Sequence, residues 1–234
     1  MATCELNDLL VKIRTVHFEL DTAILEKACD EMTSLWEWGI ERISDEDLRN
    51  AVKFYYCCIV PGEFFVAPSS TSGRHHPFWH NEAGGIVRHL TECCVSADRL
   101  LQAFGFVYYA DMKEYVEKRA RDIVLAATLI SDTFKNGSPW GEHSLKNHGE
   151  IAARFWRLTA TGRVDEEVGE QIAQAVHWHY GRYTPVPEGE HAEFEYLPKL
   201  TQIVHLLDMC SSNNDYKLIY RPVDKIPSPE SVRP

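Results

Sequence analysis

Apolar residues recur every three or four positions along most of the chain, with polar and charged residues between them. Between residues 86 and 104 the apolar positions are Ile86, Leu90, Cys93, Ala97, Leu100, Leu101 and Phe104. This spacing places the side chains on one face of an α-helix. The alternation of single apolar and polar residues that marks a strand is weak or absent. The pattern therefore predicts an all-α fold.

The same periodicity predicts further helices, bounded by residues that start or stop them. The stretches are 20–43, 44–60, 111–130, 144–160, 165–180 and 197–212. Asp21, Ser44 and Ser144 stand at helix starts as N-caps. Asp47, three residues after Ser44, completes a loose capping box. Pro61 ends the second of these stretches, because proline cannot continue a helix.

A connection rich in proline, glycine and serine follows, over residues 61–85. Connections of this length are uncommon in compact domains and are usually functional or disordered. The side chains in it that can bind a metal or an anion are Arg74, His75, His76 and His80. We therefore expect this connection to form part of a functional site.

Composition and charge narrow the range of functions. The chain has 234 residues, is 44% hydrophobic and carries a formal net charge of −11. The acidic balance argues against broad electrostatic binding to a nucleic-acid backbone and leaves room only for a local basic groove. No apolar run approaches the ~20 residues of a membrane span, and the N-terminus is acidic where an export signal is basic. We expect a cytoplasmic protein with no membrane partner.

The seven cysteines give no sign of a metal–thiolate site. Their number is odd, no two have the CxxC spacing, and the adjacent pairs Cys57-Cys58 and Cys93-Cys94 fall inside helical patterns. We expect reduced, mostly buried thiols, as in a cytosolic protein.

Three side chains that can bind a metal lie where the pattern predicts burial or its edge. Asp208 lies inside the last helix, Asp132 closes the apolar run 124–130, and His89 borders the stripe of 86–104. Burying an ionised carboxylate without a partner is costly, so Asp208 needs a cation or a hydrogen-bond network. An arginine or lysine partner is one solution. A divalent ion is the other, because one imidazole and two carboxylates suit Mn²⁺, Mg²⁺, Fe²⁺, Ni²⁺, Co²⁺ or Zn²⁺.

The order of these residues resembles that of the HD-domain metal phosphohydrolases. The family pattern is a first histidine, a His-Asp doublet, two further histidines and a final aspartate on a helical bundle. The matching segments are GGIVRHLTEC, LAATLISDTFKNG, HSLKNHGEIAARFW, VHWHYGRYT and IVHLLDMCSSN. A further segment, GRHHPFWHNEAGG, is similar to the histidine-rich approach in HD-domain 3′-to-5′ exoribonucleases and in related phage and bacterial HD proteins. The resemblance covers roughly residues 74–216 and rests on short motifs in the right order.

The resemblance implies a role for each matching residue. The side chains expected to bind the metal are His89, Asp132, His148 and Asp208. Those expected to act in catalysis, by orienting water, contacting phosphate or assisting the leaving oxygen, are Asp132, Lys135, His177 and His179. Those expected to bind the substrate are Arg74, His76 and Arg182.

The doublet departs from the family pattern, because Ser131 stands where the histidine is expected. Serine is a poor ligand for these ions, so the site loses one imidazole. The ion can bind through the first histidine and the two aspartates, with water in the vacant place. The two later histidine segments can hold that ion or a second one. In the third interpretation the site is degenerate and binds a nucleotide without cutting it. The retained Asp132 and Lys135 favour an active site.

The resemblance implies an HD-like domain at residues 74–221, after an N-terminal helical extension at 1–73 and before a tail at 222–234 that is rich in proline and charge. It implies hydrolysis of a phosphate ester in a nucleotide or a short nucleic acid. The competing interpretation is a degenerate HD-fold protein that binds a nucleotide or a protein partner without catalysis. A homo-oligomer is compatible with both.

Overall fold

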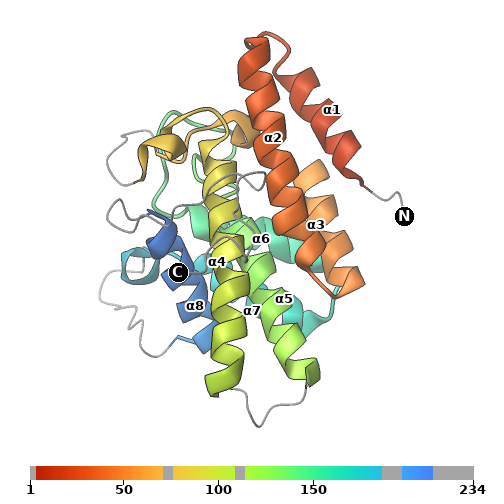
Figure 1. Cartoon of the computed structure of the whole chain (residues 1–234), viewed down its shortest axis with the longest axis vertical. Coiled ribbons are helices and arrows are strands. Elements are labelled where there is room, and N and C mark those ends of the chain that lie inside the picture. The colour runs from red at the N-terminus through yellow and green to blue at the C-terminus, as the bar shows by residue number, and fades with distance from the viewer. Residues whose placement is uncertain (1–3, 71–75, 109–113, 186–196, 213–234) are drawn as a thin grey trace, which may run out of the picture.

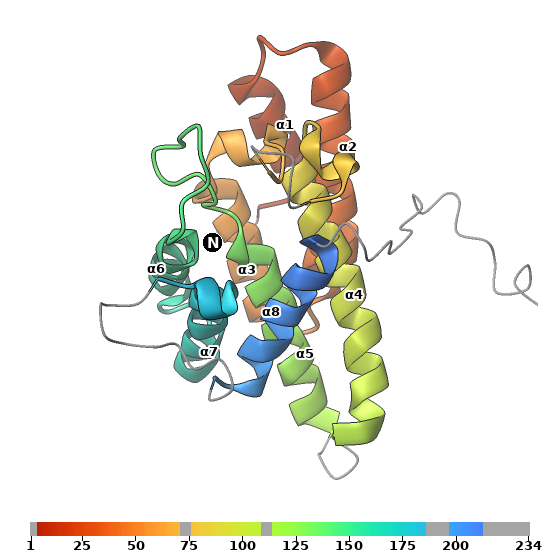
Figure 2. The ribbon, with the colours of Figure 1, turned by 90° about the vertical axis from the view of Figure 1, so that its left-hand side faces the viewer.

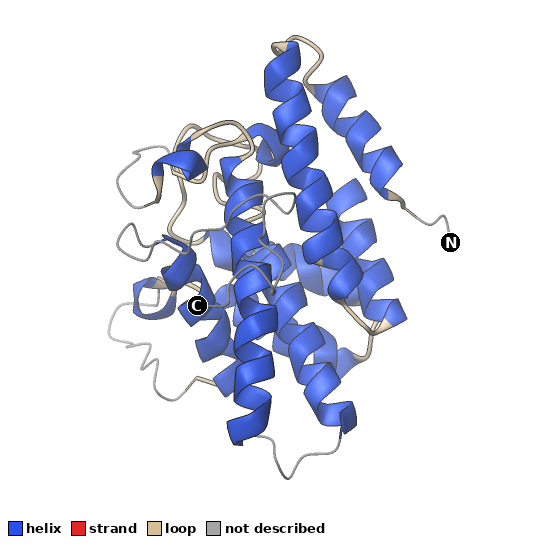
Figure 3. Cartoon of the chain, in the orientation of Figure 1, coloured by secondary structure: helices blue, strands red, loops and turns tan. Residues whose placement is uncertain are grey.

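The computed structural model describes residues 4–70, 76–108, 114–185 and 197–212 (Figure 1). Within these ranges every regular element is a helix, as the colouring by secondary structure shows (Figure 3). The α-helices are α1 (Leu6–Val16), α2 (Thr22–Trp38), α3 (Glu46–Cys58), α4 (Gly85–Tyr108), α5 (Glu114–Ser131), α6 (His148–Ala160), α7 (Glu166–His177) and α8 (Lys199–Ser212). The short 3-10 helices are η1 (Ile40–Arg42), η2 (Gly62–Val66), η3 (Phe78–Asn81) and η4 (Gly181–Tyr183). The prediction of an all-α fold is confirmed.

α4 and α5 pack against each other, and α2, α3, α6, α7 and α8 each contact at least one of them. α2 packs along α4, while α8 contacts both α4 and α5, and Figure 2 shows α8 lying across these two helices. α6 and α7 pack together, and both contact α5. None of the described helices is long and apolar enough to cross a membrane.

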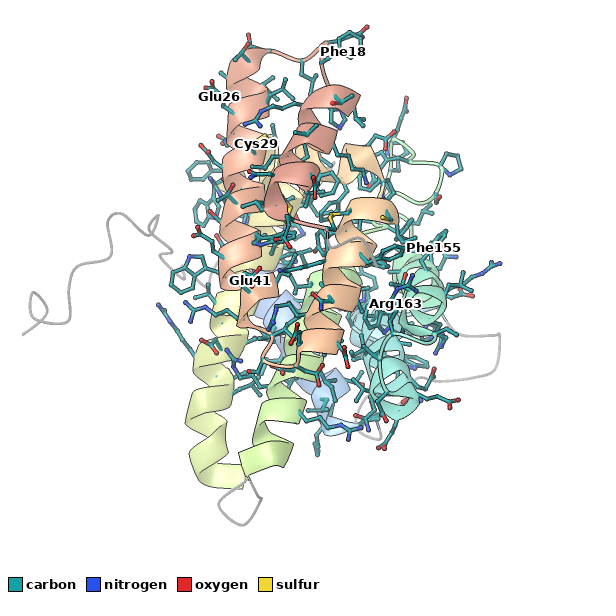
Figure 4. The ribbon with its side chains drawn as sticks, turned by 90° about the vertical axis from the view of Figure 1, so that its right-hand side faces the viewer. Phe18, Glu26, Cys29, Glu41, Phe155 and Arg163 are labelled. Carbon is teal, nitrogen blue, oxygen red and sulfur yellow. A yellow bond between two sulfur atoms is a disulfide. The ribbon has the colours of Figure 1, made fainter. Side chains whose placement is uncertain are left out.

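The first three helices share one hydrophobic core with the rest of the described chain. Two buried tyrosines of α3 reach the end of α5: the hydroxyl of Tyr55 lies 2.9 Å from Thr133 Oγ1, and that of Tyr56 donates to the carbonyl of Leu129 at 2.5 Å. The guanidinium of Arg163, which Figure 4 labels, lies 4.2 Å from the centre of the Phe54 ring of α3. α3 is therefore anchored directly beside the segment that carries Asp132. The division of the chain at residue 73 stays a prediction.

One of the two N-caps predicted for α2 and α3 is present in the structure, and the other is not. Asp21 caps α2 as predicted, accepting a hydrogen bond from the Ala23 N–H at 2.8 Å. The prediction that Ser44 caps α3 is wrong, because Asp45 is the N-cap. The backbone N–H of Ser44 instead donates to the buried carboxylate of Asp122 at 3.0 Å, so this aspartate ties the start of α3 to α5 and has a structural role.

The start of α6 also differs from the prediction. Ser144 does not cap it, because Asn147 is the N-cap and the helix begins only at His148. The segment between α5 and α6 is fixed by a hydrogen bond from the Leu145 N–H to the Lys135 carbonyl at 2.8 Å. His148 therefore stands in the first turn of its helix, beside the turn that follows α5.

The expectation that all cysteines are free thiols is wrong for one pair. Cys4 and Cys57 form a disulfide with Cα atoms 6.5 Å apart, drawn as a yellow bond in Figure 4. It links the segment before α1 to the end of α3. The pair is separated by 53 residues, and a separation of this kind gives no local motif from which pairing can be recognised. The remaining cysteines, Cys29, Cys58, Cys93, Cys94 and Cys210, are free.

Candidate metal centre

Five segments bring histidine and aspartate side chains to one buried place between α4, α5 and α8. These side chains are His89 in α4, Asp132 directly after α5, His148 at the start of α6, His179 two residues after α7, and Asp208 in α8. The first four are no more than 4% exposed, and the side chain of Asp208 is 15% exposed. Ligands from separate helices that meet in a core are typical of metal sites in helical bundles.

The first donor group joins α4, α5 and α8. The Nε2 atom of His89 lies 3.0 Å from Asp208 Oδ1 and 3.4 Å from Asp132 Oδ2. These three side chains are separated by more than 40 residues along the chain, yet their ligand atoms all lie within 4.8 Å of one another. The prediction that His89, Asp132 and Asp208 converge on one site is confirmed.

The second donor group uses the other oxygen of the same aspartate. Asp132 Oδ1 lies 3.1 Å from His148 Nε2 and 3.6 Å from His179 Nε2. The two Nε2 atoms are themselves 2.9 Å apart. Asp132 therefore stands between two donor groups, with one carboxylate oxygen directed at each.

Backbone carbonyls fix the tautomers of the two histidines in the second group. His148 Nδ1 lies 2.5 Å from the Leu145 carbonyl, and His179 Nδ1 lies 2.7 Å from the Val176 carbonyl. A carbonyl only accepts, so each Nδ1 carries the proton and each neutral ring presents a lone pair at Nε2. Two lone pairs and a carboxylate oxygen then face one another, which is stable only with a cation among them. Two imidazoles and a carboxylate oxygen suit a divalent transition metal, and the alternative is a proton on one ring.

The charges at the site act on one another strongly. Burial by itself would raise the pKa of Asp132, but the charge of Lys135, followed by the contacts of His148 and His179 with its carboxylate, holds that pKa well below its usual value. Lys135 Nζ lies 2.9 Å from Asp132 Oδ2. Burial opposes the protonation of His179, yet its hydrogen bond to Asp132 and the charge of that carboxylate outweigh burial and raise its pKa.

The remaining aspartate is also held as an anion. Burial would raise the pKa of Asp208, but the hydrogen bond and charge of His89 lower it to about 2. With neutral imidazoles, the site holds two carboxylates against the single charge of Lys135. A divalent cation would offset this excess of negative charge.

A buried carboxylate that the sequence analysis missed orients the first histidine. His89 Nδ1 lies 3.0 Å from Ser211 Oγ, which donates to Glu92 Oε2 at 3.2 Å. With its proton committed to Glu92, Ser211 accepts the His89 Nδ1 proton, so an ion bound between the aspartates would meet the Nε2 lone pair of a neutral His89. Such outer partners fix the tautomer and orientation of metal-binding histidines. Glu92 comes three residues after His89, one helical turn on, and this spacing was the available signal.

Close packing between α6 and α7 sets the distance between His148 and His179. A Cβ atom added at Gly149 would lie 2.8 Å from the Val176 carbonyl oxygen and 3.0 Å from His179 Nδ1. Glycine is therefore required where α6 approaches the end of α7. Beside it, the Phe155 ring stacks on that of Phe134, with centroids 4.5 Å apart, and holds α6 against the turn that contains Lys135.

Ser131 does not act as a ligand in this arrangement. Its side chain is buried, and its hydroxyl donates to the carbonyl of Thr128 in the preceding turn of α5 at 2.9 Å. Serine back-bonding of this kind is common within helices. The two polar residues that follow the apolar run 124–130 therefore have separate roles. Ser131 is the last residue of α5, and Asp132 reaches the site.

The other predicted residues fall in different places. His76 is buried, with its ring 4.9 Å from that of His89 between centroids. His177, the last residue of α7, packs against the Trp178 ring and belongs to none of the donor groups found among the described residues. Arg74 lies outside the described residues, as does the side chain of Arg182. The roles proposed for His76, for His177 and for both arginines stay predictions.

Comparisons with known proteins identified no relative of this chain. No protein-family model matches the chain, and no match was found among curated proteins or solved structures.

Proposed function

We propose that the chain is a metal-dependent phosphohydrolase of the HD type that acts on a phosphate ester of a nucleotide or short nucleic acid. The observation that carries this proposal is the position of Asp132, which directs one oxygen to each of two buried donor groups. The order of the contributing segments along the chain, which resembles the HD family, supports the same reading. The choice of a nucleotide substrate comes from that resemblance.

The donor atoms determine how an ion would be held. His89, Asp132 and Asp208 would bind one divalent ion through Nε2 and two carboxylate oxygens. When bound, such an ion lowers the pKa of a water molecule and offsets negative charge on phosphoryl oxygens. Water would complete the coordination in place of the imidazole that the family doublet supplies.

The chain's own residues would position the substrate and move protons. Lys135, which is part-buried beside Asp132, would attract a phosphoryl oxygen. Asp132 would accept a hydrogen bond from the attacking water. His179, whose pKa is raised by Asp132, would donate a proton to the leaving oxygen when the second donor group holds a proton instead of a second ion.

Phosphate release from a panel of nucleotides and short oligonucleotides, measured with and without Mn²⁺, tests the proposal. We expect Mn²⁺-dependent release by the wild type and a loss of at least about a hundredfold in Asp132→Asn, a range typical for loss of a group that acts in acid–base catalysis. His143→Ala is the matched control, because His143 is exposed and lies outside the donor groups. The proposal would be contradicted if the wild type released no phosphate, or if Asp132→Asn released phosphate as fast as the wild type.

One observation favours the non-catalytic alternative. The hydroxyl of Ser131 is turned back to the Thr128 carbonyl, so nothing at that position replaces the family imidazole. A protein that binds nucleotides with Mn²⁺ but releases no phosphate from any of them would support a binding role. Equilibrium dialysis with the same nucleotide panel separates the two functions.

A further inference from the structure

Three histidines form a separate group on the other side of His89. His76, His80 and His89 have ligand nitrogens within 4.8 Å of one another, and all three side chains are buried. Their ring centroids are 4.9 to 5.7 Å apart in each pair. Two of them come from the connection before α4 and the third from α4 itself, so the fold brings three imidazoles together, with the carboxylates of Glu92 and Asp208 beside the group at 3.0 Å from His80 and His89.

Backbone contacts hold this connection in place. The N–H of Ser69 donates to the His80 carbonyl at 2.7 Å, and the Ser69 hydroxyl lies 3.2 Å from His76 Nδ1. A Cβ atom at Gly85 would collide with the His80 carbonyl. Glycine at the start of α4 thus allows the connection to fold tightly over the helix.

His80 has a lone pair without a partner. Its Nε2 lies 3.0 Å from Glu92 Oε2, and an ionised carboxylate only accepts, so Nε2 carries the proton. Its Nδ1 is then a lone-pair acceptor, and this atom is buried and makes no hydrogen bond to any described residue. A ring that donates one N–H to a carboxylate and presents the other nitrogen unpaired is the arrangement found around metal-binding histidines.

We propose that His76, His80 and His89 form a second metal site that prefers zinc. Three neutral imidazoles favour Zn²⁺ over Mg²⁺ or Mn²⁺, which prefer oxygen ligands. Zn–N bonds of about 2.0–2.1 Å require ligand nitrogens less than about 4.2 Å apart, and the three nitrogens already lie within 4.8 Å of one another.

The two sites share a ligand. A neutral imidazole has one free lone pair, so His89 serves either the imidazole group or Asp132 and Asp208. Zinc at the imidazole site would therefore displace the ion from the carboxylate site. This inhibitory consequence rests on the proposed phosphohydrolase function, whereas zinc binding does not.

Zinc binding by purified metal-free protein tests the site directly. Zinc K-edge X-ray absorption of the protein loaded with one equivalent of Zn²⁺ is expected to show three imidazole ligands. His80→Ala and His76→Ala are each expected to weaken zinc binding by at least about tenfold. Loss of a residue that only orients a metal ligand already weakens metal binding by about that much, and loss of a ligand should cost more. Mn²⁺ binding should stay within about twofold of the wild type, because neither residue belongs to the carboxylate group.

Controls separate this proposal from the function. His143→Ala should leave zinc binding unchanged, and the melting temperatures of the metal-free variants show which of them fold. A coordination shell with one imidazole and several oxygens, or unchanged zinc affinity in a folded His80→Ala or His76→Ala variant, would overturn the zinc site. Where hydrolysis is measurable, zinc inhibition should be relieved in His80→Ala. If no hydrolysis is found, the absorption result stands by itself.

Discussion

The Nε2 atoms of His148 and His179 lie 2.9 Å apart, although both rings have their Nδ1 protons committed to backbone carbonyls. The fold therefore holds two lone pairs together beside Asp132, and a cation must lie among them. In the metal-free protein a proton on one ring can take that place, and the contact with Asp132 raises the pKa of His179 in favour of it. A metal that binds there has to displace it.

The first prediction concerns pH. Because the pKa of His179 is raised on folding, its contribution to stability is fully present below its unfolded pKa of about 6.5 and is lost as pH rises through the folded pKa. The difference in free energy of unfolding between metal-free wild type and His179→Gln should therefore be largest below about pH 6.5. Urea denaturation across a pH series measures it. A difference that grows with increasing pH would contradict the assignment.

The second prediction is that Asp208→Ala loses metal binding and activity together. The change removes one of three donors near His89, so Mn²⁺ affinity should fall by more than the roughly 10- to 100-fold that loss of an outer partner costs. Calorimetric titration with Mn²⁺ measures this fall. Glu150→Gln, an exposed carboxylate on α6, is the control and should bind as the wild type does. If Asp208→Ala keeps its metal, Asp208 serves only as an ion-pair partner of His89.

The third prediction separates Ser131 from its neighbour. Ser131→Ala removes one hydrogen bond to the Thr128 carbonyl, which should cost about 0.5–1.5 kcal/mol of stability. Metal affinity should stay within about twofold, since the serine is no ligand and the Asp132 donors are retained. Thermal unfolding and Mn²⁺ titration of the same preparation measure both effects. A large loss of metal would show that the serine hydroxyl reaches the ion.

The fourth prediction concerns the approach of α6 to α7. In Gly149→Ala the new methyl group would meet the Val176 carbonyl and His179 Nδ1, so we expect a loss of about 1–3 kcal/mol and weaker metal binding. Gly169→Ala is the matched control, because a Cβ there meets only side-chain atoms at 3.3 Å or more. Equal effects of the two changes on metal affinity would argue that the α6–α7 distance does not set the site.

The sequence predicted every described α-helix except α1. It also predicted the convergence of His89, Asp132 and Asp208, because burial of an apolar stripe determines which way neighbouring polar residues point. Helix starts were less predictable, since Asp122 binds the backbone of Ser44 from a distant helix and competes with local capping. Contacts over long sequence separations leave no periodic signal.

The residues that orient His89 could not be predicted from the sequence for the same reason. The bond between Glu92 and Ser211 spans 119 residues, and neither residue type marks a metal site by itself. The choice between His177 and His179 depended on how the chain turns after α7. In the structure His179 faces Asp132, while His177 packs against Trp178.

The central claim is that Asp132 stands between two donor groups that bind divalent cations, and anomalous scattering from a crystal grown with Mn²⁺ tests it most directly. The account predicts a manganese peak bound by His89, Asp132 and Asp208, and a second peak, if two ions bind, bound by the other oxygen of Asp132 with His148 and His179. No anomalous peak within bonding distance of Asp132, at a Mn²⁺ concentration that saturates the protein in solution, would contradict it.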